Sequence, residues 1–279
     1  MPKKGQSRRK VPVRGRVSLA QKRKKQRIIA AIVGSVLLLA LCGGFLYVVR
    51  LPEVSIQDIQ VEGTYAVSPE LVRGIVEQEL KDSTLIVIPR RMIFTYPGKD
   101  IENALLQHIP RLQSLSLSRD SLFGTTLIVS VVERNAYGIW CAGESEPTCY
   151  KMDASGFIFA PADSFAEYYL FYGGMATDTD PIARYFYPDH MEALRNLLNQ
   201  LSPAGLDPHV VRVLEGSDVE IELLDGMRIR ASLEVAPAET VSLLEAALGS
   251  DTLKERREDI EYLDARFDNR VYFKFKGEE

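Results

Sequence analysis

The feature that most constrains this chain is a run of 22 residues without a charged side chain, residues 28–49, which lies between Arg27 and Arg50. As an α-helix this run would be about 33 Å long at about 1.5 Å per residue, enough to cross the roughly 30 Å hydrocarbon core of a bilayer. A cleavable signal peptide would have a shorter apolar core and a small-residue cleavage site, and neither is evident. No later stretch is comparable, so we expect one retained transmembrane helix over 28–49.

The charged residues divide the chain at this run. Twelve of the 34 Lys and Arg residues lie within residues 1–27, which contain no acidic residue, and all 38 acidic residues follow the apolar run. The positive-inside rule places such a basic tail in the cytoplasm and the remainder outside the plasma membrane, as in a single-pass type II membrane protein. Contact with anionic lipid headgroups explains the tail's charge, so we expect no nucleic-acid partner.

The part after the membrane has the composition of a folded protein. The whole chain is 46% hydrophobic and 26% charged, which excludes general disorder. Residues 54–134 predict the order β-α-α-β-β: a strand over 56–61, a helix that starts at Ser68-Pro69, a second helix between Pro97-Gly98 and Pro110, and strands over 112–119 and 125–133. The apolar segment 84–97 between the helices is expected either to pack over the sheet edge or to contact the membrane.

Residues 135–276 predict a second, mostly antiparallel β domain with helices over 191–201 and 237–248, so the fold class is α+β. Its most informative segment is a hairpin over 219–233. A two-residue turn at Asp225-Gly226 would mix the apolar and polar faces of the two strands. We therefore expect a three-residue loop, 224–226, with Gly226 left-handed. This register places Leu223 opposite Met227, Glu222 opposite Arg228 and Glu220 opposite Arg230.

The sequence contains none of the common catalytic motifs. His108, His190 and His209 stand alone, outside any H-E-x-x-H pattern, and there is no G-x-S-x-G, P-loop or G-x-G-x-x-G segment. The Asp264/Arg266 pair is expected to be structural. The sequence thus predicts no catalytic, metal or cofactor-binding residue, and a protein that is not an enzyme.

Three cysteines are too few for a disulfide-dense miniprotein or a four-cysteine zinc site. Cys42 lies in the apolar run and is expected to be a hydrophobic filler. Cys141 and Cys149 enclose a nine-residue segment on the side of the membrane where oxidation is allowed. We expect these two to form a disulfide rather than remain as two free thiols.

Several segments, taken in order, resemble the FtsQ/DivIB family of bacterial cell-division proteins. The five-element module resembles the POTRA domain and opens with the sequence Ile-Gln-Val-Glu-Gly at 59–63. Residues 131–140 are similar to the family pattern V-x-E-R-x-P-x-A-x-W, with the family's proline replaced by Ala136 or absent. Residues 151–159 are similar to V-D-x-x-G-x-x-F, and residues 260–272 to Y-I-D-L-R-F-x-N-R-V-Y, with Ala265 in place of leucine. The apolar insertion 84–97 and the cysteine pair depart from the family pattern.

The resemblance implies a non-enzymatic divisome scaffold. Such a protein binds small bitopic division proteins of the FtsB/DivIC and FtsL type and thereby controls septal peptidoglycan synthesis. Binding would occur by strand addition to a C-terminal edge strand. The implied partner-binding residues are Phe267, Asn269, Arg270, Val271, Tyr272, Phe273, Lys274 and Phe275. Phe273 and Phe275 share one face of this strand, and whether they fill the core or leave the edge free for a partner stays open.

Two other functions compete with this one. A membrane-tethered extracytoplasmic enzyme of cell-wall metabolism would need a histidine or serine constellation, and the sequence has none. A POTRA-type export or assembly factor would carry repeated modules or a membrane β-barrel, and 279 residues hold neither. We therefore favour the division scaffold.

Overall fold

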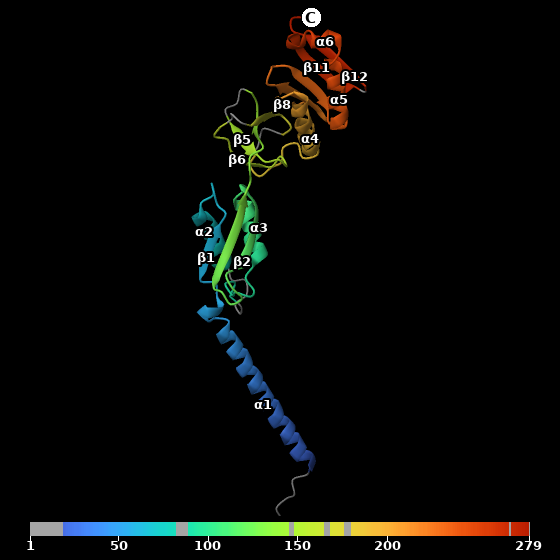
Figure 1. Ribbon diagram of the computed structural model, residues 1–279. Helices are drawn as coiled ribbons and strands as arrows, with labels where there is room; N and C mark the ends of the chain where they lie inside the picture. The colour runs from blue at the N-terminus through green and yellow to red at the C-terminus, as the bar shows by residue number, and fades with distance from the viewer. Residues whose placement is uncertain are drawn as a thin grey trace, which may run out of the picture.

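The computed structural model describes residues 19–81, 89–144, 148–164, 168–175, 180–267 and 269–278. The first element is the long helix α1 (Leu19–Val48), whose segment Arg23–Val48 is long and apolar enough to cross a membrane. It extends away from the rest of the chain (Figure 1), and its apolar side chains are exposed. The helix starts inside the basic tail that we expected to span 1–27, because Ala, Gln, Lys and Arg are good helix formers. It ends at Val48, and Val49 is already buried.

An N-terminal unit of residues 52–133 follows the helix. It contains η1 (Pro52–Val54), β1 (Asp58–Glu62), α2 (Pro69–Lys81), α3 (Gly98–His108), β2 (Leu112–Arg119) and β3 (Thr126–Glu133). The three strands form a sheet in the order β1-β3-β2, with β1 parallel and β2 antiparallel to β3. The predicted sequence of elements is therefore confirmed at this coarse level.

The core of the N-terminal unit lies between this sheet and the two helices. Leu127, Val129 and Val131 of the central strand β3 are buried with Val72, Val76, Ile101 and Leu105 from the helices. Both faces of β3 are apolar in sequence, which is typical of an interior strand. β3 does lie inside the sheet, between β1 and β2, but Val132 on its opposite face is exposed to solvent. The helices cover one face of this sheet only.

The segment between α2 and α3 is described from Pro89 onward, and residues 82–88 lie outside the described ranges. Met92 forms a β-bridge with Ser55, and the Ile93 amide donates to the Val54 carbonyl over 3.0 Å. Ile93 itself is buried. The described part of the insertion therefore packs beside the chain that leads into β1.

A C-terminal unit of residues 137–276 contains a nine-stranded sheet in the order β12-β11-β10-β9-β8-β7-β4-β5-β6. Its strands are β4 (Gly138–Cys141), β5 (Cys149–Met152), β6 (Ile158–Pro161), β7 (Tyr169–Tyr172), β8 (Pro208–Val213), β9 (Asp218–Leu223), β10 (Arg228–Ser232), β11 (Ile260–Phe267) and β12 (Arg270–Phe275). Its helical elements are α4 (Met191–Leu201), η2 (Ser202–Ala204), α5 (Pro237–Leu248), α6 (Asp251–Lys254) and η3 (Arg257–Asp259).

This sheet is mixed. The pairings β4/β7, β7/β8 and β10/β11 are parallel, and the remaining five are antiparallel. Parallel neighbours need a crossover connection, which α4 supplies between β7 and β8 and α5 between β10 and β11. Most of the pairings are thus antiparallel, as expected, but the three parallel ones make the sheet mixed, and α4 and α5 supply two of the crossovers.

The two crossover helices bury their apolar sides in one continuous core. Leu194, Leu198 and Leu201 of α4 and Leu244 of α5 are fully buried with Val211, Ile221 and Ile229 of the sheet.

The hairpin of β9 and β10 has the predicted register, with charged residues at alternate positions of the two strands. Glu222 stands opposite Arg228, and Glu220 opposite Arg230. The Leu223 amide donates to the Met227 carbonyl, and Gly226 has φ +84°, so the predicted three-residue hairpin is confirmed.

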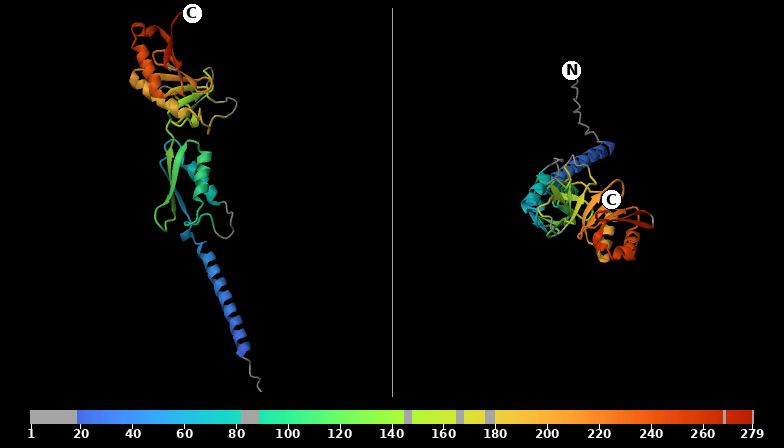
Figure 2. Two further views of the ribbon diagram at one scale, coloured as in Figure 1. Left: turned by 90° about the vertical axis from the view of Figure 1, so that its right-hand side faces the viewer. Right: turned by 90° about the horizontal axis from the view of Figure 1, so that it is seen from above.

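The two units lie end to end (Figure 2), and Arg134 joins them. Its Nε donates to the Pro110 carbonyl over 3.1 Å in the N-terminal unit. Its Nη1 donates to Asp153 Oδ2 over 2.5 Å in the C-terminal unit, and its guanidinium lies 4.1 Å from the centre of the Phe157 ring. Burial by itself raises the pKa of Asp153, but hydrogen bonds from Ser155 and Arg134 outweigh it and hold that pKa below its ordinary value.

Candidate partner-binding edge

β12 is the terminal strand of the nine-stranded sheet. It pairs antiparallel with β11, with Phe275 opposite Ile260, Phe273 opposite Leu263 and Tyr272 opposite Asp264. On its other side no strand of the described residues pairs with it. Its free backbone groups therefore form an open sheet edge, the structure to which another strand can add.

The direction of the free amides follows from one hydrogen bond. The Lys276 amide donates to the Asp259 carbonyl over 2.8 Å, toward β11. Because successive amides of a strand point to opposite sides, the amides of 270, 272 and 274 also point toward β11. The amides of Val271, Phe273 and Phe275 then point to the open edge, where they are available to a partner strand.

Phe273 and Phe275 share a face of β12 but not an environment. Phe275 is 4% exposed and belongs to the core, whereas Phe273 is 44% exposed at its rim. Their ring centres lie 5.3 Å apart in an edge-to-face arrangement, and the Arg256 guanidinium lies 3.6 Å from the centre of the Phe275 ring. Of the two residues, only Phe275 therefore fills the core.

A second exposed aromatic pair joins the end of β11 to the opposite face of β12. Phe267 and Tyr272 are both about half exposed, and their ring centres lie 5.1 Å apart. Lys274 Nζ lies 3.7 Å from Glu261 Oε2, and Arg270 is exposed. Asn269, in the turn between β11 and β12, has φ +55°, a conformation that asparagine tolerates better than most residues. All eight residues implied as partner-binding thus lie on this one hairpin.

A buried carboxylate supports the strand next to the edge. Asp264 of β11 is buried and accepts hydrogen bonds from Arg266 Nε at 2.9 Å and Nη2 at 2.7 Å. Arg266 Nη1 also donates to Asp218 of β9 over 2.9 Å. Burial alone would raise the pKa of Asp264, but the hydrogen bonds from Arg266 outweigh it and hold that pKa below its ordinary value. The Asp264/Arg266 pair is thus a structural tie between β11 and β9.

Ion pairs between neighbouring strands join β8, β9, β10 and β11. Arg230 Nε lies 2.9 Å from Glu220 Oε2, and Arg212 Nη1 lies 2.8 Å from Glu222 Oε2. Arg228 Nη2 lies 2.5 Å from Glu261 Oε1 on β11. The hairpin pattern predicts the first of these pairs. The Arg228–Glu261 pair requires β10 to lie parallel beside β11, which no local pattern indicates.

The cysteine pair lies in the half of the sheet that is remote from β12. Cys141 and Cys149 are directly opposite each other on β4 and β5, with Cα atoms 4.3 Å apart, and form a disulfide. Residues 145–147 of the loop that it closes lie outside the described ranges. Ile139, Leu170 and Tyr172 surround the disulfide in a small apolar cluster.

The histidines belong to different elements, none of them in the β11–β12 hairpin: His108 ends α3, His190 precedes α4, and His209 lies in β8. His108 Nδ1 lies 2.8 Å from the Ala104 carbonyl oxygen, and the His190 ring lies 4.8 Å from that of Tyr187. Across the described ranges, no group of three or more His, Cys, Asp or Glu residues is placed to hold a metal ion.

Comparison with known proteins adds no family assignment: no protein-family model and no curated protein sequence matches this chain.

Proposed function

We propose that this protein is a single-pass scaffold of the bacterial division machinery, with its N-terminus in the cytoplasm and its two β units outside the plasma membrane. Its partners would be small bitopic division proteins of the FtsB/DivIC and FtsL type, and it would control septal peptidoglycan synthesis by holding them. The observation that carries the proposal is the open edge of β12 at the end of the chain remote from α1 (Figure 1).

Other features support this proposal. The N-terminal unit has the β-α-α-β-β order that the resemblance to FtsQ/DivIB proteins implies. The motif segments 131–140 and 151–159 meet at one place, because Arg134 of the first binds Asp153 of the second. The third segment, 260–272, forms β11 and the start of β12. Segments that carry a family likeness would then serve the joint between the units and the partner-binding hairpin.

Strand addition gives the edge a specific physical role. A partner strand would accept hydrogen bonds from the amides of Val271, Phe273 and Phe275 and would donate to the neighbouring carbonyls. Main-chain hydrogen bonds would supply affinity, while the exposed rings of Phe267, Tyr272 and Phe273 would select the partner's side chains.

A proline at position 271 tests this role without removing the strand. Proline is tolerated on an edge strand where its missing amide would face solvent, so Val271→Pro should leave the β11 pairing in place. We expect Val271→Pro to abolish co-purification of the small division proteins from membranes, and Val271→Ala to retain it. A truncation after Phe267 is a poorer test, since it also removes the buried Phe275.

Fluorescence of Trp140, the single tryptophan, checks that both variants are folded. If folded Val271→Pro protein still captures the partners, the β12 edge does not bind them. If neither the wild-type protein nor Val271→Ala captures a division protein, the proposed function itself is wrong.

A further inference from the structure

The end of the N-terminal unit nearest α1 is built close to the helix. Only residues 49–51 separate α1 from η1, and Val49 among them is buried. The Ser55 hydroxyl donates to the Leu51 carbonyl over 3.2 Å, and Gln57 Nε2 donates to the Pro52 carbonyl over 2.9 Å. If α1 crosses a bilayer, this end of the unit lies at the membrane surface. Tyr47 near the end of α1 is exposed, and tyrosine at this position is typical of a membrane interface.

An exposed apolar tip projects at the same end. The turn between β2 and β3 is level with the start of β1, because the Gln57 amide donates to the Thr125 carbonyl over 2.8 Å. Leu122 and Phe123 in this turn are each 69% exposed, and Phe94 is 49% exposed. The rings of Phe94 and Phe123 meet edge to face with centres 6.0 Å apart. We call these three residues the apolar tip.

Arg119 holds the tip in its exposed position. Its Nη1 donates to the Leu122 carbonyl over 2.7 Å, and its guanidinium lies 5.5 Å from the centre of the Phe94 ring. Large apolar side chains in a turn normally fold inward or mark a binding surface, and these are fixed outward. Aromatic and leucine side chains beside an arginine suit the boundary between lipid headgroups and acyl chains.

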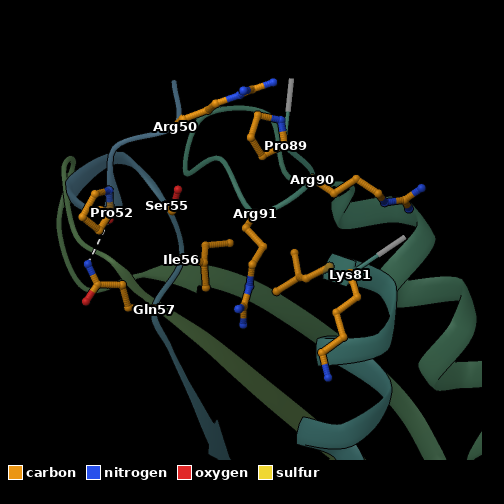
Figure 3. A pocket seen from close by; sticks show the side chains of 10 residues that line it. Arg50, Pro52, Ser55, Ile56, Gln57, Lys81, Pro89, Arg90 and Arg91 are labelled. Atoms are coloured by element: carbon orange, nitrogen blue, oxygen red, sulfur yellow. Dashed lines mark hydrogen bonds between the residues drawn. The ribbon is translucent and has the colours of Figure 1, made fainter. Parts of the chain in front are cut away.

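A cationic pocket opens at this end as well (Figure 3). It has a volume of about 670 Å³, and its lining includes Arg50, Lys81, Arg90 and Arg91. Arg90 is engaged by Asp100 at 2.7 Å and Glu79 at 3.5 Å. Arg91 Nε is buried and has no hydrogen-bond partner among the described residues. A buried guanidinium nitrogen without a partner is costly, and an anionic group in the pocket would satisfy it.

We propose that this end of the N-terminal unit is seated on the outer leaflet of the membrane that α1 spans. The apolar tip inserts at the headgroup level, and the cations that line the pocket attract an anionic phospholipid, whose phosphate Arg91 binds. The inference rests on the transmembrane role of α1 in the proposed function, but it does not depend on division partners. Seating would fix the height of the C-terminal unit above the membrane, and with it the height of the β12 edge.

Tryptophan quenching by brominated lipids tests the position of the tip. The full-length protein is reconstituted in liposomes of brominated phosphatidylcholine with or without phosphatidylglycerol. Phe123→Trp reports on the tip, Leu46→Trp on α1, and Leu224→Trp on an equally exposed apolar residue of the β9–β10 turn. The native Trp140 is buried in the C-terminal unit and gives the background. We expect quenching at position 123 to exceed that at position 224 by about twofold or more, since only the former lies at the interface.

Two results would overturn the seating. If position 46 is quenched and position 123 is quenched no more than position 224, α1 is inserted but the tip is not in the membrane. If position 46 is not quenched either, α1 does not span the bilayer, and both the seating and the single-pass part of the proposed function are wrong. Absence of division partners from a pull-down would leave the quenching unchanged, so the two proposals fail separately.

The pocket has its own test in the same samples. Phosphatidylglycerol should increase quenching at position 123, and the triple change Arg50→Gln, Lys81→Gln and Arg91→Gln should abolish that increase. The matched control removes three exposed cations of the C-terminal unit, by Lys254→Gln, Arg257→Gln and Lys276→Gln, and should retain it. An equal loss in both triple variants would contradict a specific pocket. If inorganic phosphate, and not chloride at equal ionic strength, cancels the effect in the wild type, the pocket takes the free ion rather than a lipid headgroup.

Discussion

At the scale of single residues, Gly63 is fixed by a close backbone approach. It follows β1 with φ +82°, and a Cβ atom added there would lie 2.2 Å from the Val131 carbonyl oxygen. We expect Gly63→Ala to lower the free energy of unfolding by about 1–3 kcal/mol, since both the conformation and the clash oppose a side chain. Thermal unfolding of the full chain in detergent, followed by far-UV circular dichroism, measures the change.

Gly74 is the matched control for this prediction. It lies inside α2, and an added Cβ would have no neighbour within 4 Å. Gly74→Ala should raise stability by up to about 1 kcal/mol through helix propensity. Similar effects of the two substitutions would contradict the role of the close approach at Gly63.

Asp264 makes stability depend on pH. Its folded-state pKa is below its ordinary value, so its stabilising effect is fully present above the unfolded-state pKa of about 3.9 and is lost as pH falls through the folded-state value. We expect the urea midpoint of the C-terminal unit, followed by Trp140 fluorescence, to fall below about pH 4. Asp264→Asn should lower the free energy of unfolding at neutral pH by about 2–3 kcal/mol, because Arg266 loses one of its two charged partners and keeps only Asp218.

The exposed Glu255 provides the control for this pH dependence. Glu255→Gln should leave both the neutral-pH midpoint and its decline in acid close to wild type. An Asp264→Asn variant that retained the full wild-type decline would assign the effect to other carboxylates, such as Asp153, whose pKa is also lowered.

At the scale of elements, the disulfide fastens β4 to β5. The loop-entropy relation for a nine-residue loop gives a stabilisation of about 2.6 kcal/mol. The double change Cys141→Ser and Cys149→Ser should therefore lower the urea midpoint by up to that amount, read from Trp140, which is the neighbour of Cys141 in β4. Cys42→Ser should have no effect, since Cys42 is exposed on α1. Alkylation of all three cysteines without prior reduction would show that the bond does not form.

The crossover helices explain why the C-terminal sheet is mixed. α4 and α5 bury leucines on the same face of the sheet, and each returns the chain to a strand parallel to the one it left. The sequence predicts both helices but not which strands they connect. The same arrangement leaves β12 outermost, so the candidate edge is a consequence of how the helices pack.

At the scale of the whole molecule, Arg134 is the main polar tie at the joint between the two units. Arg134→Gln removes the ion pair with Asp153 and weakens the contact with Phe157. We expect each unit to stay folded while their relative orientation becomes less restricted. The measurement is the distance between spin labels at the exposed positions Ser116 and Glu255, in a Cys42→Ser background. The distribution of this distance should be broader in Arg134→Gln than in the labelled protein that keeps Arg134.

Arg73→Gln is the control for this experiment. It also removes an arginine, but Arg73 Nε donates a hydrogen bond to the Ile59 carbonyl within the N-terminal unit, so the joint between the units is not affected. Its distance distribution should match that of the parent. An unchanged distribution in Arg134→Gln would mean that other contacts, such as Arg111 against Phe159, hold the joint.

Much of this protein was determined by local patterns in the sequence. The uncharged run predicts the apolar part of α1, and the 3.6-residue apolar spacing predicts α2, α3 and α4. Pro237 and Gly249 mark the ends of α5, and the alternation of apolar and charged residues predicts the register of β9 and β10. These features follow from the sequence because helix period, strand period and turn conformation depend on residues that are close along the chain.

The tertiary structure alone decided the contacts between distant segments. Glu133 accepts hydrogen bonds from the amides of Tyr65, Ala66 and Val67, and Arg134 meets Asp153. The motif segments contain these three charged residues, but they do not indicate which groups the charges contact. The tertiary structure also separated the buried Phe275 from the exposed Phe273 and brought Phe94 to Phe123. Such contacts depend on which surfaces meet when the whole chain is packed, and a pattern read over a few residues carries no information about that choice.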